Sequence, residues 1–107
     1  MKQWCDAPFT INIPELDLNS VRDIRVTLEQ GPYKVKTTDV EVLGPHDLKC
    51  LFTQEQTGIF SSFESVTGVI NYISNATGLR CATQNFVIPV DYNPDDEELV
   101  GEATGNE

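Results

Sequence analysis

The stretch Asp23-Ile24-Arg25-Val26-Thr27-Leu28-Glu29-Gln30 alternates polar and apolar residues, and Gly31-Pro32 follows it. Successive side chains of a β-strand point to opposite faces of the sheet, so the apolar members are expected to face a core. Gly31-Pro32 predicts a turn. The alternation resumes in Tyr33-Lys34-Val35-Lys36-Thr37, in which Tyr33 and Val35 are expected to face inward. Together the two segments predict an antiparallel hairpin.

Further segments on both sides of this hairpin have the composition of short strands. They cover residues 9–13, 40–43, 47–52, 66–73 and 79–90. The segment 66–73 is apolar on both faces, as expected of a central strand. In the last segment the inward-facing set shifts from Leu79 and Cys81 to Phe86 and its alternate neighbours, which predicts a bulge near residues 83–85.

The period of the pattern changes after residue 52. Thr53 and Gln56 stand three residues apart and fit a capping box, in which each side chain accepts a hydrogen bond from the other residue's backbone. One or two helical turns are therefore predicted over residues 53–60, where they would close one end of a sandwich. About seven short strands, turn signals every ~8–12 residues and one short helix predict an all-β, immunoglobulin-like antiparallel β-sandwich. The Cys–Trp–Cys pattern of antibody domains is missing, because Trp4 precedes the first strand.

Charge is distributed unevenly along the 107 residues. The chain has 17 acidic and 7 basic residues, a net charge of −10, yet the seven acids after residue 90 are accompanied by no base. A chain of this length forms one domain. We therefore predict a β-sandwich domain at 1–90 and an acidic, disordered C-terminal tail at 91–107. Alternatively, the tail docks on a basic partner through acids that include Asp95, Asp96, Glu97 and Glu98.

The sequence also indicates the cellular compartment in which the protein is expected. No apolar run reaches the ~18–20 residues of a membrane span. Residues 1–8 lack the apolar core of an export signal, which predicts an intracellular product that makes no membrane contact. The three cysteines, Cys5, Cys50 and Cys81, are odd in number, so free thiols in a reducing compartment are expected. Cys50 and Cys81 lie in apolar segments and are predicted to be small buried side chains.

Groups suited to catalysis are not recognisable in the sequence. The only histidine, His46, lies in the turn Gly44-Pro45-His46-Asp47, where an exposed side chain without a nearby nucleophile is expected. Neither a glycine-rich phosphate loop nor a metal-ligand spacing is present. The sequence predicts a protein that is not an enzyme and has no catalytic residue, metal or cofactor. The bases Arg22, Arg25, Lys34 and Lys36 are too few to predict direct contact with nucleic acid.

Other residues are candidates for contact with a partner. The short strand around Val40 and Val42 is guarded only by Asp39 and Glu41, so its edge could pair with a strand of another molecule. Trp4 and Phe9, near the start of the chain, are further candidates. The alternative for Trp4 is a side chain folded over the open end of the sandwich.

Four segments, in their order, carry a resemblance to a known group of proteins. They are Ile11-Asn12-Ile13-Pro14, the stretch 21–30, the stretch 48–60 with its Thr53-Gln54-Glu55-Gln56-Thr57, and the closing hairpin 68–90. Their order resembles that of small β-sandwich proteins from phages and prophages of gut and other Gram-positive bacteria. The sandwich is similar to the N-terminal domain of siphophage upper-baseplate proteins. The resemblance covers roughly residues 9–90.

This resemblance implies a non-enzymatic structural or accessory protein of the virion, in its tail, baseplate, fibre or head surface. Its partners would be other virion proteins and copies of itself, arranged in a ring or a trimer. It would be found in the host cytoplasm during assembly and then in the virion. Two other functions remain open: an acidic DNA mimic that inhibits a host nuclease, and a generic immunoglobulin-like adhesion or carbohydrate-binding module.

Overall fold

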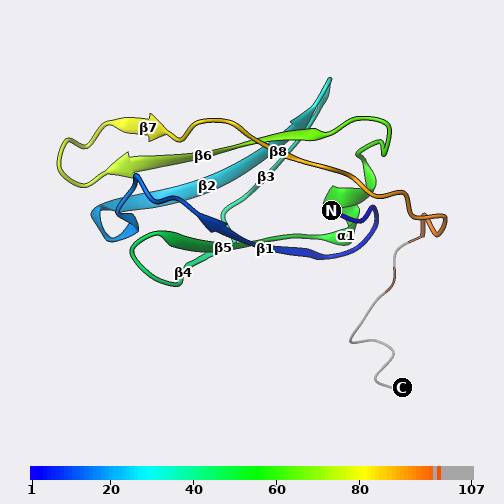
Figure 1. The fold of residues 1–107 in the computed structure, drawn as a ribbon, viewed down its shortest axis with the longest axis horizontal. Coiled ribbons are helices and arrows are strands. Elements are labelled where there is room, and N and C mark those ends of the chain that lie inside the picture. The colour runs from blue at the N-terminus through cyan, green and yellow to red at the C-terminus, as the bar shows by residue number, and fades with distance from the viewer. Residues whose placement is uncertain (98, 100–107) are drawn as a thin grey trace, which may run out of the picture.

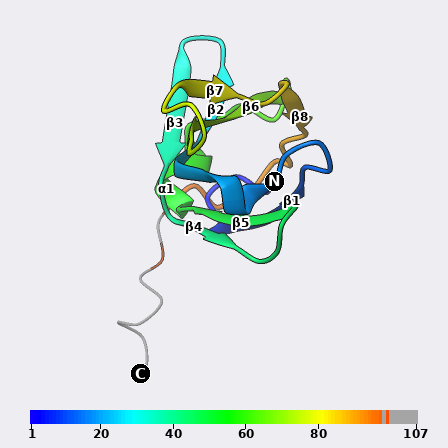
Figure 2. The same ribbon diagram turned by 90° about the vertical axis from the view of Figure 1, so that its left-hand side faces the viewer.

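Two antiparallel sheets lie face to face in the computed structural model, which describes residues 1–97 and Leu99 (Figure 1). One sheet has three strands in the order β1-β5-β4, and the other has five strands in the order β3-β2-β6-β7, with β8 also paired to β6. Figure 2 shows the two layers from one end of the molecule. The predicted all-β sandwich with one short helix is confirmed at this level.

The eight strands of the described residues are short, apart from β2 and β6. Their bounds are β1 Ala7–Asn12, β2 Val21–Gln30, β3 Tyr33–Thr37, β4 Val40–Val42, β5 Asp47–Phe52, β6 Val66–Ser74, β7 Arg80–Ala82 and β8 Phe86–Ile88. A single 3-10 turn, η1 Leu18–Ser20, precedes β2, and the helix α1 is Gln54–Gly58. No helix of the described residues is long and apolar enough to cross a membrane.

The core lies between the inner faces of the two sheets. Its most deeply buried large side chains are apolar and come from both sheets and from the segment after α1: Val26, Leu28, Leu48, Phe52, Phe60, Val66 and Ile70. The aromatic pair Phe9 and Phe52 meets edge to face, with ring centroids 6.3 Å apart. Alternation along each strand brings these residues to one side, as the sequence predicts.

The hairpin of β2 and β3 is confirmed, with Val26 paired to Thr37 and Gln30 paired to Tyr33. Gly31 has a φ of +57° in its turn, a conformation that glycine adopts without steric cost. Tyr33 lies on the inner face of the sheet as expected, because it is paired directly with the buried Gln30, but its side chain is 53% exposed. The hairpin tip projects away from the three-stranded sheet, so nothing on the other side of the core covers Tyr33 (Figures 1 and 2).

The capping box predicted at the start of α1 is present. Thr53 Oγ1 accepts a hydrogen bond from the Gln56 backbone at 3.3 Å, and Gln56 Oε1 accepts one from the Thr53 backbone at 2.9 Å. Thr57 is fully buried, and its hydroxyl donates to the carbonyl of Cys5 at 2.9 Å. The helix therefore joins the N-terminal segment to the end of the sandwich.

The predicted last strand is divided into β7 and β8, and the interruption falls at residues 83–85 as expected. Thr83 fills the gap, because its backbone donates to Ile70 O at 2.9 Å and its Oγ1 accepts from Ile70 N at 3.1 Å. The ring of Phe86 lies directly on Gly68, where a Cβ would approach it to 2.3 Å. This contact accounts for a glycine inside the central strand β6.

Three predicted side-chain environments are wrong. Leu79 was expected inward but is 65% exposed, because it lies in the turn before β7. Cys81 was expected to be buried but is only half-buried, since β7 is a short strand at the margin of its sheet. His46 was expected to be exposed but is half-buried, with its Nδ1 2.8 Å from the carbonyl oxygen of Leu16.

Candidate interaction surfaces

The outer face of the five-stranded sheet gathers most of the basic residues. Residues directly opposite each other in paired strands point to the same face. The register places Arg22, Ile73 and Arg80 in one row and Arg25, Asn71 and Ala82 in the next. A third row holds Lys36, Thr27 and Val69, and a fourth holds Lys34, Glu29, Thr67 and Val87. We call this surface the basic face.

Five of the seven basic residues of the chain belong to the basic face: Arg22, Arg25, Lys34, Lys36 and Arg80. Its acids are Asp23 and Glu29, and each is paired with a neighbouring base. Arg22 Nη1 lies 3.1 Å from Asp23 Oδ2, and Lys34 Nζ lies 3.5 Å from Glu29 Oε2. These pairs are exposed and therefore weak. The face is positively charged in a chain whose net charge is −10.

A pocket of about 630 Å³ lies where this face meets the edge of β2. Strand β3 pairs only with residues 26–30 of β2, so within the described residues no strand covers that edge of residues 21–25. A β-bulge interrupts the pairing with β6 here, and Asp23 at its centre has a φ of 53°. The pocket is lined by side chains that include Asp23, Arg25, Thr38, Val40, Ile73 and Arg80.

The two arginines of this pocket differ in their hydrogen bonds. Arg80 donates to Asn71 Oδ1 from Nε at 3.3 Å and from Nη2 at 3.2 Å. Arg25 Nε is buried and has no hydrogen-bond partner among the described residues. Buried polar groups are nearly always paired, so this donor stands out. A guanidinium stays charged and suits carboxylates and phosphates, so the pocket offers donors to an anionic group.

Trp4, predicted as a partner contact, is half-buried at the end of the sandwich. Its backbone φ is 62°, and its ring lies against Gly58 of α1. This geometry corresponds to the alternative of a side chain folded over the open end. Contact of Trp4 with a partner stays a prediction.

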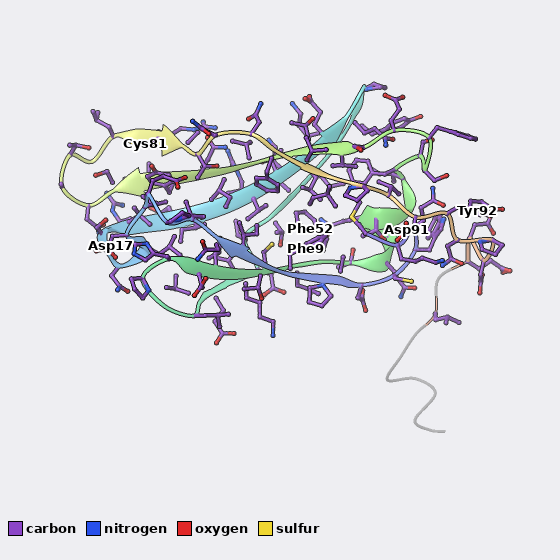
Figure 3. All side chains as sticks on the ribbon, viewed as in Figure 1. Phe9, Asp17, Phe52, Cys81, Asp91 and Tyr92 are labelled. Atoms are coloured by element: carbon purple, nitrogen blue, oxygen red, sulfur yellow. The ribbon has the colours of Figure 1, made fainter. Side chains whose placement is uncertain are left out.

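Phe9 and Val40 lie on opposite sides of Cys50 in one row across β1, β5 and β4. Cys50 is buried, and both neighbours pack against the core, so this row faces inward (Figure 3). Val42, two residues further along β4, is 40% exposed. Of these candidates, Val42 is therefore the one most accessible to a partner.

The acids Asp95, Asp96 and Glu97 are exposed, and Glu98 lies outside the described residues, as does the rest of the predicted tail after Leu99. The preceding residues are bonded to the N-terminal segment. The Asp91 backbone donates to Met1 O at 2.7 Å and its carbonyl accepts from Gln3 N at 3.0 Å. Figure 3 shows Asp91 and Tyr92 at the α1 end of the molecule and Cys81, on β7, at the other end.

The sequence candidates thus do not form one site. Trp4 and the acids lie near α1, Phe9 and Val40 face the core, and Val42 lies on a sheet edge. The basic face was missed because its fifth base, Arg80, lies far in the sequence from the four bases of β2 and β3. Alternation in β2 and β3 was a usable signal for Arg25, Lys34 and Lys36, but Arg80 joins them only through the pairing of β6 with β7.

Within residues 1–97 and Leu99, no three or more His, Cys, Asp or Glu side chains are grouped so as to hold a metal ion. All three cysteines are free. Burial, followed by the charge of Asp39, raises the pKa of the Cys50 thiol from 9.0 to about 11. This thiol is therefore protonated at neutral pH and unreactive as a nucleophile.

Large apolar side chains also reach the surface in several places. Phe63, in the loop before β6, is 95% exposed, and Val87 on the basic face is 67% exposed. Exposed aromatic and aliphatic groups next to charged ones are usual at protein contact surfaces.

No protein-family model, curated protein or solved structure matches this chain.

Proposed function

We propose that this chain is a non-enzymatic structural or accessory protein of a phage particle that acts through protein–protein contacts. The observation that carries the proposal is the separation of charge: a basic face on one sheet and an acidic segment after residue 90. A surface with regions of both signs selects and orients protein partners. The phage setting rests on the resemblance of residues 9–90.

Contacts with other virion proteins and with copies of the same chain follow from this proposal, in a ring or a trimer. The protein would be made in the host cytoplasm and then incorporated in the virion. An acidic DNA mimic is less well supported, because a mimic needs carboxylates across a rigid surface. Here five of the seven bases share one face of the sheet framework.

We also propose that the sandwich is immunoglobulin-like. In such domains one sheet contains strands A, B, E and D, and the other contains C, F and G, with C′ added in variable-type domains. If β1 corresponds to B, the order β1-β5-β4 corresponds to B-E-D. The order β3-β2-β6, followed by β7 and β8, then corresponds to C′-C-F-G. An experimental structure with another strand order would contradict this proposal.

Quantitative mass spectrometry of purified particles tests the function. Particles are prepared from the host that carries the gene, and the copy number of this chain is measured against the major capsid protein. A fixed copy number, such as a multiple of three or six, is the expected result. Abundance in infected cells together with absence from particles would overturn the proposal.

A further inference from the structure

The pocket between Arg25 and Arg80 is the one place among the described residues where a buried side-chain nitrogen lacks a partner. Two guanidinium groups line it, and Arg22 lies in the same row as Arg80. The only acid in its lining is Asp23, which is already paired with Arg22. The pocket therefore has an excess of donors and of positive charge, which suits a carboxylate ligand.

The backbone beside the pocket is also suited to a peptide. Residues 21–25 of β2 have β6 on one side and no strand of the described residues on the other. An unpaired strand edge exposes N–H and C=O groups that can bind an extended segment. A segment lying there would continue the line of β3 and bring its side chains next to Arg22 and Arg25.

The chain itself contains a segment of matching charge. Residues 91–107 hold seven acids and no base, and the described members Asp95, Asp96 and Glu97 are exposed. These acids lie at the α1 end, where the backbone of Leu99 donates to Gln54 Oε1 at 2.8 Å. The pocket is lined by Arg80 of β7, and β7 lies at the opposite end of the molecule, which is 46 Å long (Figures 1 and 3). As placed, the acids of one copy cannot occupy its own pocket.

We infer that the acidic segment after residue 90 of one copy binds the Arg25–Arg80 pocket and the adjoining β2 edge of a second copy. The contact joins opposite ends of two molecules, so it is head-to-tail, and such contacts close into a ring when the rotation allows. This inference rests on the proposed function, for which it names the self-contact. Exposed ion pairs are individually weak, so we expect a Kd of about 10–100 µM at low salt.

Sedimentation velocity of the full chain over a range of concentrations tests the inference. We expect concentration-dependent assembly at about 50 mM salt that is lost at about 500 mM, because screening shortens the range of exposed charges. Arg25→Glu with Arg80→Glu, or Asp95→Lys with Asp96→Lys, should each weaken assembly about tenfold or more. Lys49→Glu, on the exposed side of the three-stranded sheet, is the matched control and should leave assembly unchanged.

A mixing experiment guards against variants that merely misfold. The face variant (Arg25→Glu, Arg80→Glu) and a tail variant with four reversals (Asp95→Lys, Asp96→Lys, Glu97→Lys, Glu98→Lys) should each be monomeric alone and should form a complex when mixed. Their charges are then complementary, because the four reversals leave the tail with four bases and three acids, whereas the face variant has four acids and three bases on its face. Failure to form this mixed complex, when circular dichroism shows both variants folded, would overturn the inference.

Nucleic acid is the competing ligand for a basic face. Fluorescence anisotropy with a labelled single-stranded oligonucleotide of about 20 nucleotides measures whether the basic face binds nucleic acid. Binding that depends on Arg25 and Arg80, in a chain that stays monomeric, would overturn the self-contact. A chain that stays monomeric in solution but is found at a fixed copy number in particles would also overturn the self-contact. That result would still support the proposed function.

Discussion

Trp4 combines a positive backbone φ of 62° with a ring that lies on Gly58, the last residue of α1. A Cβ at Gly58 would come within 2.4 Å of the Trp4 ring, closer than two carbons can approach. The absence of a side chain at position 58 is thus what lets the N-terminal segment lie on the helix. The pairing of one large and one minimal residue holds the α1 end of the sandwich closed.

Substitution Gly58→Ala should therefore destabilise the fold by about 1–2 kcal/mol, because the cost of displacing the ring exceeds the gain in helix propensity. In a Trp4→Ala background the same change should be neutral or stabilising. Urea denaturation of the two single variants and the double variant measures this reversal of sign. The control is Gly44→Ala, where the nearest atom to a Cβ, Asp47 Oδ2, is 3.9 Å away. Equal costs in both backgrounds would contradict the explanation.

The buried thiol of Cys50 makes stability depend on alkaline pH. In the unfolded chain it ionises near its ordinary pKa of 9.0, whereas burial raises its pKa to about 11 in the folded protein. Between these values the unfolded state has lost the proton that the folded state keeps. Stability therefore falls as pH rises from about 9 to about 11, by up to about 2–3 kcal/mol.

Urea titrations at a series of pH values, on the natural chain and on Cys50→Val, check this expectation. Valine fills a similar volume and does not ionise, so the variant should lose less stability across the interval. Cys81→Val, at a half-buried position, is the matched control. A pH dependence that is identical in the natural chain and in Cys50→Val would refute the assignment to this thiol.

At the scale of the elements, Gln30 joins the end of β2 to the loop between α1 and β6. Its Nε2 donates to Ser61 O at 2.8 Å and to Glu64 O at 2.9 Å, and its Oε1 accepts from Ser61 N at 2.7 Å. The side chain is only 6% exposed. A single buried amide thus fixes the loop that presents Phe63 to solvent.

Gln30→Leu should cost about 2–4 kcal/mol, because it removes three hydrogen bonds and leaves buried backbone groups of the loop unpaired. The expected second effect is faster hydrogen exchange at Ser61, whose backbone N–H loses its acceptor. Thermal unfolding and exchange monitored by mass spectrometry provide the two measurements. Gln84→Leu, at an exposed position, should change neither. Unaltered exchange at Ser61 would show that the amide does not hold the loop.

The strands with the clearest alternation were predictable from sequence because local periodicity reports burial directly. The hairpin of β2 and β3, the capping box at Thr53 and the interruption at residues 83–85 all follow from short-range patterns. The exposure of Tyr33 and Leu79 did not, because it depends on where the opposite sheet ends. The basic face was predictable only in part, because Arg80 lies more than fifty residues from Arg25 in sequence and only the register of β6 brings them together.

At the scale of the whole molecule, the two sheets present different surfaces to a partner. The outer face of the five-stranded sheet carries positive charge, whereas the three-stranded sheet ends at β4, a strand of three residues paired only to β5 within the described chain. Edge strands of this kind expose backbone groups that invite pairing. Val42 lies on that edge and is 40% exposed.

Under the proposed function in a phage particle, Val42→Lys should reduce incorporation of the protein into particles severalfold, since lysine on an edge opposes strand addition. The cost in stability should stay below about 1 kcal/mol, because the lysine stem can lie along the apolar surface. Copy number by quantitative mass spectrometry, together with a melting curve, distinguishes the two effects. Thr10→Lys, on the outer side of β1, is the control. A normal copy number in particles that contain Val42→Lys would show that the β4 edge does not pair with a partner during incorporation.

The bridge between the first and last segments of the domain has a mechanical consequence. Lys2 and Asp91 pair in parallel, with one hydrogen bond from Asp91 N to Met1 O and one from Gln3 N to Asp91 O. When the chain after Asp91 is pulled away from residues 1–3 along the strand direction, both bonds are stretched at the same moment. The hydrogen-bonded residue pairs between the antiparallel strands β8 and β6 would instead break one after another, starting from one end. A force that pulls the two ends apart therefore first loads the pairing of residues 1–3 with Asp91, whose two hydrogen bonds have to break together.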